Sequence, residues 1–432
     1  MSKMTYDKAV EYLFNQLPVF QRQGAAAYKA DMGNTYKLMD MLDHPENKFK
    51  SVHVAGTNGK GSSSHMLSSI LMENGFKTGL HTSPHLKDLR ERIVINGKYC
   101  GKIYITGFLE QYREQIKHIR PSFFELMVAM AFKYFAKKSE IAVIEVGMGG
   151  RLDSTNVITP EVSLITNISY DHMQFLGNTL PKIATEKAGI IKKNTPVVIS
   201  QRQEEVKQVF IDIAKKQKAP IYFADEIFSV KNVRKQDGLQ IMDIFKDNLL
   251  YLKDLRLPLC GDYQQKNILG VLQVIEVMNA SKKYHISLGD IRRGIENVQN
   301  NFPIMGRWQT ISNEPLTICD TGHNVDGLQY VIKQLNGIKK EKLHFVIGVV
   351  NDKDIENEIK MLPKDAVFYL CKADIPRGLD VKILAQKFAK AGLNFLEFDS
   401  VKSALKQAQK DALQSGGMVF VGGSTYTVAE II

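Results

Sequence analysis

The feature that most constrains the fold is a glycine-rich segment, Val54–Ser62, near the start of the chain. An apolar run precedes it, and a helix-like segment from Ser63 to Asn74 follows it. Glycines let the backbone turn and present N–H groups to phosphate oxygens, while Lys60 supplies a charge and the Ser62 hydroxyl can reach a magnesium ion. The order of strand, glycine loop, lysine, hydroxyl and helix therefore predicts a phosphate-binding loop.

This loop departs from the commonest pattern at two positions. Val54 stands where the first glycine would fall, and Gly61 separates Lys60 from Ser62. The alternative is a glycine-rich turn with an exposed lysine, but the order of the elements favours a phosphate loop.

Composition describes a globular protein of ordinary make-up. A chain of 432 residues predicts two domains, and a net charge of +11 favours anionic partners. The lysines are spread out, so we expect anionic small molecules and no nucleic acid. Neither a signal peptide nor a membrane-spanning run is present, which predicts a cytoplasmic protein without a membrane partner. The cysteines are scattered and are expected to be reduced thiols: Cys100, Cys260, Cys319 and Cys371.

Strand-like and helix-like segments alternate from residue 50 onward, which predicts a doubly wound, mostly parallel sheet. Strands are expected at 50–55, 78–82, 141–146, 162–166, 197–200 and 221–223, with a small β insert at 226–259. Helices are expected from a capping box at Ser122 and Glu125 to Lys137, from Thr179 to Lys192, from Asp262 to Asn279, and over 288–298.

The pattern breaks at Asn300–Pro303, where we place a domain boundary. Residues 1–299 are expected to form the phosphate-loop domain, and residues 300–432 a smaller Rossmann-like α/β domain. Strands of the second domain are expected at 316–319, 344–349, 367–371 and 418–421.

Polar residues follow the strands of the first domain. Glu145 ends a buried strand, and Ser83 and His172 follow two others. Since parallel strands end at one edge of a sheet, these side chains are expected near the phosphate loop, where a carboxylate can bind a hard cation. The alternatives are a carboxylate held by loop N–H groups and a structural histidine. Lys187 lies among apolar residues, but the residues alone favour a solvated lysine on a helix face.

Together these motifs resemble the Mur ligase superfamily and, within it, the folylpolyglutamate synthase/dihydrofolate synthase family. The resembling segments are Gly56–Ser62, His81–Leu86, Phe123–Glu125, Glu145–Asn156, Asp171–His172, Glu186–Ile190, Asp320–Asn324, Asp352–Asp354, Pro376–Arg377 and Gly423–Ser424. The resemblance implies an ATP- and Mg²⁺-dependent ligase that adds L-glutamate to reduced folate, to dihydropteroate or to both. We expect a monomer. The substrate carboxylate would be activated as an acyl phosphate and attacked by the glutamate amine.

The resemblance also implies residue roles. Nucleotide contacts would be Thr57, Asn58, Gly59, Lys60, Gly61, Ser62, Asn267, Arg307 and Asp320. Substrate contacts would be Phe123, Phe124, Glu125, Arg151, Asp153, Arg377 and Ser424. Metal contacts would be Ser62, Ser83, Glu145, His172 and a carbamylated Lys187. Lys60, Lys187 and His323 would serve catalysis.

The chain departs from the family pattern around the adenine pocket, with Asp262-Tyr263 before Gln264 and a longer segment from Phe302 to Arg307. Two alternatives stay open. A Mur-type ligase for cell-wall precursors would share the chemistry, but an additional N-terminal domain is expected there, and only about 50 residues precede the loop. A non-enzymatic nucleotide switch would not need a second domain with polar loops.

Overall fold

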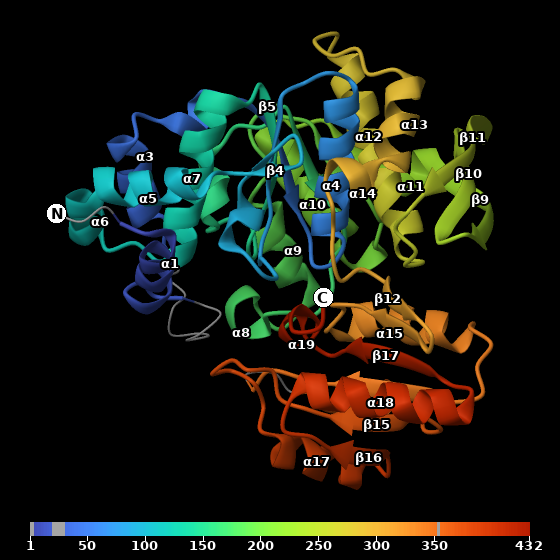
Figure 1. The fold of residues 1–432 in the computed structure, drawn as a ribbon. Coiled ribbons are helices and arrows are strands. Elements are labelled where there is room, and N and C mark those ends of the chain that lie inside the picture. The colour runs from blue at the N-terminus through green and yellow to red at the C-terminus, as the bar shows by residue number, and fades with distance from the viewer. Residues whose placement is uncertain (1–3, 20–30, 352–354) are drawn as a thin grey trace. The chain divides into compact units, whose positions relative to one another are not determined.

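A computed structural model describes residues 4–19, 31–351 and 355–432. The chain divides into two compact units (Figure 1). Among the described residues, the second unit holds Leu259–Asp262 and Met305–Ile432, and the first holds the rest. The expected boundary at residues 299 and 300 stays a prediction.

The first unit is built on an eight-stranded sheet in the order β4-β3-β2-β5-β1-β6-β7-β8. Its strands are β1 (Lys50–Ala55), β2 (Thr78–His81), β3 (Val94–Ile95), β4 (Lys98–Tyr99), β5 (Ile141–Glu145), β6 (Val162–Ile165), β7 (Val197–Ile199) and β8 (Ile221–Phe223). All pairs from β2 to β8 are parallel, and only β3 and β4 pair antiparallel at one edge. The central strands are apolar because helices cover both faces of a parallel sheet. The predicted α/β fold with a mostly parallel sheet is confirmed.

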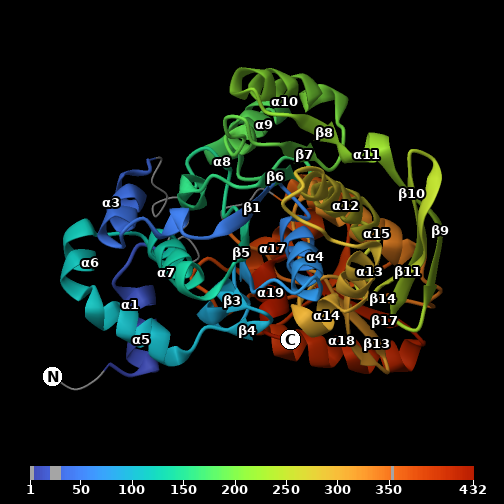
Figure 2. The same ribbon diagram turned by 90° about the horizontal axis from the view of Figure 1, so that it is seen from above.

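Helices cover the two faces of this sheet. Figure 2 shows α4 (Lys60–Glu73) and α12 (Gln264–Ala280) on one side of β1, β5 and β6, with α7 (Phe123–Lys138) on the other. Around α7 a core cluster includes side chains from α1 (Tyr6–Asn15), α3 (Gly33–Met41) and α5 (Lys102–Gln111). A second cluster joins β6 and β7 to α9 (Leu180–Ala188) and α10 (Glu204–Gln217).

The predicted β insert is confirmed as a three-stranded antiparallel sheet. It consists of β9 (Phe228–Gln236), β10 (Leu239–Lys246) and β11 (Leu249–Leu257). It packs on α12 and α13 (Leu288–Glu296), and α11 (Ala224–Ile227) leads into it.

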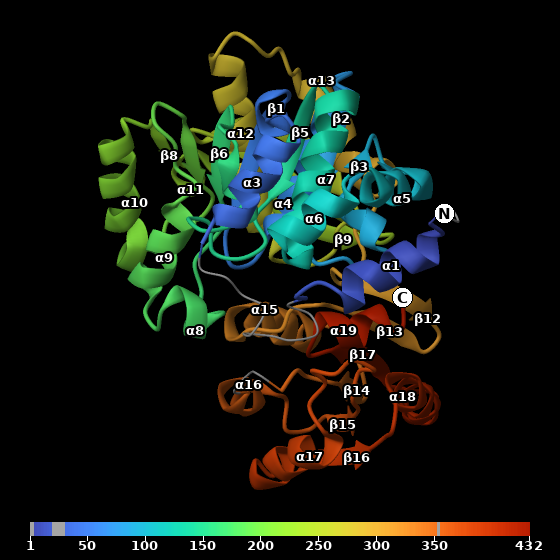
Figure 3. The same ribbon diagram turned by 90° about the vertical axis from the view of Figure 1, so that its left-hand side faces the viewer.

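The second unit contains a six-stranded sheet in the order β12-β13-β17-β14-β15-β16 (Figure 3). Its strands are β12 (Gln309–Asn313), β13 (Leu316–Cys319), β14 (Leu343–Ile347), β15 (Val367–Leu370), β16 (Asn394–Glu397) and β17 (Met418–Gly422). Its helices are α15 (Val325–Asn336), α16 (Glu356–Met361), α17 (Val381–Lys390), α18 (Val401–Ser415) and α19 (Thr425–Ala429). Only β12 is antiparallel to its neighbour.

Several expected helix ends can be compared with the observed ones. The capping box of Ser122 and Glu125 is confirmed at the start of α7, as is the Thr179 cap of α9. The expected end of α9 at Lys192 is wrong, because the helix stops at Ala188. The expected Asp262 cap of α12 is also wrong, since Tyr263 takes that position without a side-chain bond.

Two further observations concern the whole described chain. The four cysteines carry free thiols, and Cys100, Cys319 and Cys371 are buried. Within residues 4–19, 31–351 and 355–432, no helix is long and apolar enough to cross a membrane.

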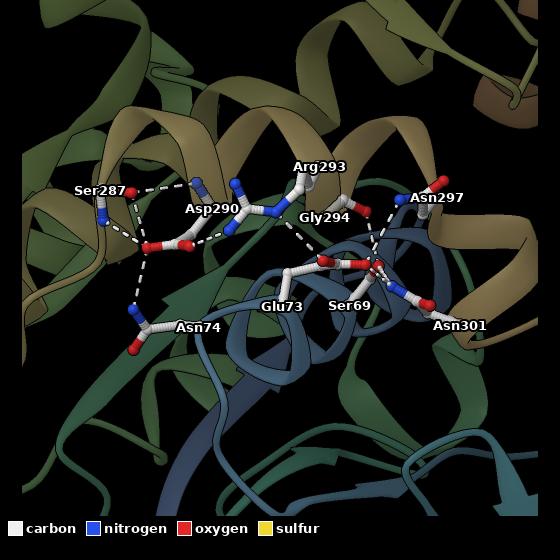
Figure 4. A network of polar contacts seen from close by, with 9 residues as sticks. All are labelled: Ser69, Glu73, Asn74, Ser287, Asp290, Arg293, Gly294, Asn297 and Asn301. Carbon is white, nitrogen blue, oxygen red and sulfur yellow. Dashed lines mark hydrogen bonds and ion pairs between the residues drawn. The ribbon is translucent and has the colours of Figure 1, made fainter.

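The phosphate-loop helix α4 is tied to α13 and to α14 (Val298–Asn301) by a polar network (Figure 4). The Glu73 carboxylate accepts hydrogen bonds from Arg293 Nε at 3.3 Å and Asn301 Nδ2 at 2.8 Å. Ser69 Oγ donates to the Gly294 carbonyl at 2.5 Å. Helix α13 approaches α4 this closely because Gly294 has no side chain, and a Cβ there would overlap the backbone of Ile70.

We expect Gly294→Ala to lower stability, because the added methyl must push α13 away from α4. Overpacking of this kind typically costs about 1–3 kcal/mol, and it should appear as a lower Tm in thermal unfolding. Gly107→Ala is the matched control, since Gly107 lies inside α5 and a Cβ there meets nothing within 4 Å. That variant should be neutral or more stable by up to about 1 kcal/mol. Equal effects of the two changes would contradict the packing argument.

Candidate active site

The loop between β1 and α4 is shaped by glycines in backbone conformations that other residues rarely adopt. Gly59 precedes the first residue of α4 with a φ of 84°, and Gly56 has a φ of 143°. A Cβ on Gly59 would overlap the Asn267 side chain, and one on Gly56 would overlap Thr166. The loop is therefore turned back against β6 and α12, with its backbone leading directly into a helix N-terminus.

Residues that follow β6 hold this loop through its backbone. Thr57 N donates to the Asn167 carbonyl at 2.9 Å, and Asn58 N donates to Asn167 Oδ1 at 2.8 Å. Thr166 Oγ1 donates to the Asn58 carbonyl at 2.5 Å. The sequence reasoning missed Thr166 and Asn167 as loop anchors, although polar residues directly after the neighbouring strand were the available signal.

Two lysines converge on one carbonyl oxygen of the loop. Lys60 Nζ donates to the Gly56 carbonyl at 3.1 Å and to the Thr57 carbonyl at 3.0 Å. Lys187 Nζ, from α9, donates to the Gly56 carbonyl at 2.8 Å. Lys187 is only 4% exposed, so the interpretation of a solvated lysine was wrong. Burial and then the charge of Lys60 lower the pKa of Lys187 to about 7.

The predicted metal donors come from different elements. Ser62 Oγ, in the first turn of α4, accepts a hydrogen bond from Gln264 Nε2 at 3.0 Å. Glu145, at the end of β5, accepts from Ser83 N at 3.0 Å. The His172 side chain is 38% exposed and lies 3.9 Å from Asp171.

These hydroxyl and carboxylate oxygens suit a hard cation such as Mg²⁺. Among the residues that the structure describes, however, no three His, Cys, Asp or Glu side chains gather as a metal cluster. A carbamate on Lys187 would add a further oxygen donor to the predicted set. The metal assignments stay predictions.

A glycine turn after β5, residues 147–150, packs against the end of α9. A Cβ on Gly150 would lie 2.8 Å from the carbonyl oxygens of Glu186 and Lys187. Arg151 N donates to the Glu186 carbonyl at 2.8 Å, and the Arg151 guanidinium pairs with the Glu186 carboxylate at 2.9 Å. The turn is therefore joined to the helix that carries Lys187.

The first turn of α7 carries three predicted substrate residues, which have different surroundings. Phe124 is half-buried and lies against Gly147, where a Cβ would meet its ring at 2.5 Å. Phe123 is buried, with its ring centroid 5.0 Å from that of Phe14. Glu125 caps α7 by accepting from Ser122 N at 2.5 Å. Of the three, Phe124 lies beside the glycine turn.

The described surface also has a hollow of about 390 Å³ between α1 and the segment Lys87–Leu89. None of the predicted site residues lines it, although His85 in its wall contacts Phe123. We assign it no role.

In the second unit, Asp320, His323 and Ser424 follow strands of the parallel part of the sheet. Asp320 follows β13, and its carboxylate accepts from Trp308 N at 2.8 Å and Gly322 N at 2.6 Å. His323 Nδ1 lies 3.0 Å from the Thr321 carbonyl oxygen. The others are Arg307, which donates to the Gly306 carbonyl, Arg377, which is 9% exposed, and Ser424, which caps α19. The segment Asp352–Asp354 lies outside the described residues.

Comparison with known proteins accounts for both units. The family model described as "Mur ligase middle domain" matches residues 54–275, and the one described as "Mur ligase, glutamate ligase domain" matches residues 306–425. The dihydrofolate synthase/folylpolyglutamate synthase of Bacillus subtilis is 32% identical over 413 residues, which cover 93% of this chain and 94% of that protein. The protein of the same name from Escherichia coli is 30% identical and covers 88% and 85%.

Solved structures agree with the sequence relatives. The chain resembles the folylpolyglutamate synthase of Mycobacterium tuberculosis complexed with ADP, with a TM-score of 0.88, 29% identity and coverage of 98% and 96%. It also resembles Escherichia coli FolC in complex with DHPP and ADP, with a TM-score of 0.85, 27% identity and coverage of 99% and 97%. The chain therefore belongs to the Mur ligase family, in its dihydrofolate synthase/folylpolyglutamate synthase branch.

Proposed function

We propose that this protein is an ATP-dependent ligase that joins the α-amine of L-glutamate to a carboxylate of reduced folate, and also to dihydropteroate. The observation that carries the proposal is the loop between β1 and α4, with two lysines directed at its Gly56 carbonyl. A carboxylate is a poor electrophile, so transfer of the ATP γ-phosphate to it supplies a leaving group. The glutamate amine then attacks the acyl phosphate and releases phosphate.

The loop is suited to hold the nucleotide. Backbone N–H groups at the start of α4 and the Lys60 ammonium favour phosphate oxygens. We assign Thr57, Asn58, Gly59, Lys60, Gly61 and Ser62 to the phosphates, and Asn267, Arg307 and Asp320 to the rest of the nucleotide. Asn267 lies against Gly59, which supports its assignment.

Mg²⁺ would offset negative charge on the phosphoryl group during transfer. We assign its binding to Ser62, Ser83, Glu145, His172 and Lys187. The Lys187 amine is buried, and with a pKa near 7 a substantial fraction of it is neutral at physiological pH. Such an amine can add to carbon dioxide: an N–C bond forms, one proton is lost, and the product is a carbamate with a single negative charge.

The remaining predicted roles concern the substrates. Phe124, beside the glycine turn, is the best supported of the proposed contacts, which also include Phe123, Glu125, Arg151, Asp153, Arg377 and Ser424. His323 is proposed to serve the reaction. We further propose a monomeric enzyme of the cytoplasm, where the free cysteines would stay reduced.

A ligase for cell-wall precursors is the main alternative, and a nucleotide switch is the other. All three are separated by one assay of ADP release. The proposed enzyme releases ADP only when both L-glutamate and a pterin substrate are present, and mass spectrometry finds the added glutamate. ADP release that needs a nucleotide-linked cell-wall precursor, or no acceptor at all, would overturn the proposal. Separate assays with dihydropteroate and tetrahydrofolate decide which of them is a substrate.

We expect Lys60→Ala to lower kcat by at least about 10²–10³-fold, the usual effect of removing a group that stabilises transition-state charge. The fold should be retained, because within the described residues the Lys60 ammonium bonds to carbonyl oxygens of its own loop. Lys98→Ala, an exposed change on β4, is the control and should keep wild-type kcat. Near-normal turnover by Lys60→Ala would refute the role of Lys60.

A second prediction concerns Lys187. Protein equilibrated with ¹³C-labelled carbon dioxide should show a carbamate signal in its ¹³C NMR spectrum, and Lys187→Ala should lose both that signal and most ligase activity. Short carboxylates such as acetate should partly restore activity by occupying the space of the carbamate.

Lys192→Ala is the matched control for that experiment. Lys192 follows helix α9, which carries Lys187, and burial also lowers the pKa of Lys192. Its Nζ, however, donates to the Asn156 carbonyl at 2.7 Å and not to the phosphate loop. Its variant should keep the carbamate signal. Loss of the signal in Lys192→Ala alone would show that the wrong lysine is modified.

A further inference from the structure

Three buried polar side chains form a continuous hydrogen-bonded chain behind the glycine turn. His53 Nε2, in the middle of β1, lies 2.9 Å from Thr155 Oγ1. Thr155 Oγ1 in turn lies 2.5 Å from Asp153 Oδ1. His53 and Thr155 are fully buried, and Asp153 is 5% exposed. We call these three residues the His53–Asp153 chain.

The direction of these hydrogen bonds follows from the available protons. Thr155 has one hydroxyl proton, and the Asp153 carboxylate is an acceptor that already takes backbone N–H groups on both oxygens. The hydroxyl therefore donates to Asp153 and accepts from His53, which must carry its proton on Nε2. The opposite tautomer would bury an N–H at Nδ1, where no hydrogen-bond partner reaches among the described residues.

The far end of the chain holds the glycine turn. Asp153 Oδ2 accepts from Met148 N at 2.9 Å, and Oδ1 accepts from Thr155 N at 3.0 Å. Asp153 thus joins the middle of the turn to the short helix η4 (Ser154–Val157). The other side of that turn rests on the carbonyl oxygens of Glu186 and Lys187.

Packing alone does not call for this arrangement. An apolar pair of similar size at positions 53 and 155 would fill the same space without leaving a buried nitrogen unsatisfied, as Nδ1 of His53 is. What the polar pair adds is direction, because each bond allows only one orientation of the next group. A fixed orientation matters most at Asp153, because its carboxylate holds the turn at residues 147–150. That turn lies against Phe124 and against the end of the helix that carries Lys187.

We propose that His53 and Thr155 are positioning residues of the ligase: they orient the Asp153 carboxylate, which sets the turn at residues 147–150 against the helix of Lys187. This inference rests on the proposed function. Asp153 remains among the proposed substrate contacts, and holding the turn is an additional contribution of its carboxylate.

The test is Thr155→Val, which keeps the side-chain shape but removes the hydroxyl between His53 and Asp153. We expect kcat for folate glutamylation to fall about 10–100-fold, the size of loss that follows when a side chain that orients a site residue is removed. The KM for ATP should change by less than about twofold, because Thr166 and Asn167 hold the phosphate loop independently. Thr155→Ser restores the hydroxyl and should recover kcat to within about threefold of wild type.

Thr106→Val is the matched control. Thr106 is also buried, and its hydroxyl donates to the Ile103 carbonyl at 3.2 Å within α5, away from the predicted site. Its variant should keep kcat, whatever its effect on Tm. Equal kcat in Thr155→Val and Thr106→Val, or a Thr155→Ser enzyme as slow as Thr155→Val, would overturn the proposal.

A spectroscopic readout tests the hydrogen-bond direction itself. In protein with ¹⁵N-labelled histidine, the His53 ring should be neutral with its proton on Nε2, and its signals are assigned by their absence from His53→Gln. Thr155→Val should shift the Nε2 signal, while Thr106→Val should not. A proton on Nδ1 would overturn the proposal. Wild-type enzyme that forms no amide would instead refute the proposed function. The NMR result would still decide the direction of the hydrogen bonds in the His53–Asp153 chain.

Discussion

Two lysines directed at the Gly56 carbonyl are the interaction on which the rest of the site depends. Lys60 and Lys187 both donate to this oxygen, from helices that are far apart in sequence. Burial of Lys187 and, after it, the charge of the neighbouring Lys60 lower the pKa of Lys187 to about 7. In the proposed reaction, Lys60 serves as a fixed charge and Lys187 as a reactive amine. A phosphate loop with a single lysine would provide only the first.

Close backbone approach makes that pairing possible. Gly150 and Gly189 are the positions where the turn after β5 meets the end of α9, and a Cβ on Gly189 would overlap Arg151. Without side chains at these positions, the Arg151 N–H reaches the Glu186 carbonyl. The turn and the helix of Lys187 therefore behave as one packed unit. The same turn is also held by Asp153, whose carboxylate accepts a hydrogen bond from Met148 N.

Features that depend on local patterns were largely predictable from the sequence. Strands β1, β8 and β13 have their predicted bounds, and the capping box of α7 was recognised from two residues. Strands β3, β4, β12 and β16 were missed, because they are short or partly polar and are defined by pairing with a neighbour. The start of α12 was misplaced, because Tyr263 takes the N-cap position without a side-chain hydrogen bond that the sequence could have signalled.

The sequence by itself determined the phosphate loop, the order of strands and helices and the family resemblance, since these depend on residue type and spacing along the chain. Only the tertiary structure decided that Lys187 is buried, whereas the residues alone had suggested a solvated side chain. Its burial depends on β1 and α9 meeting across 131 positions. The hydrogen bond between His53 and Thr155 was likewise not predictable, because a contact between residues far apart in the chain has no signature in local sequence. Desolvation and polar pairing are set by neighbours in space, and spacing along the chain does not reveal which neighbours those are.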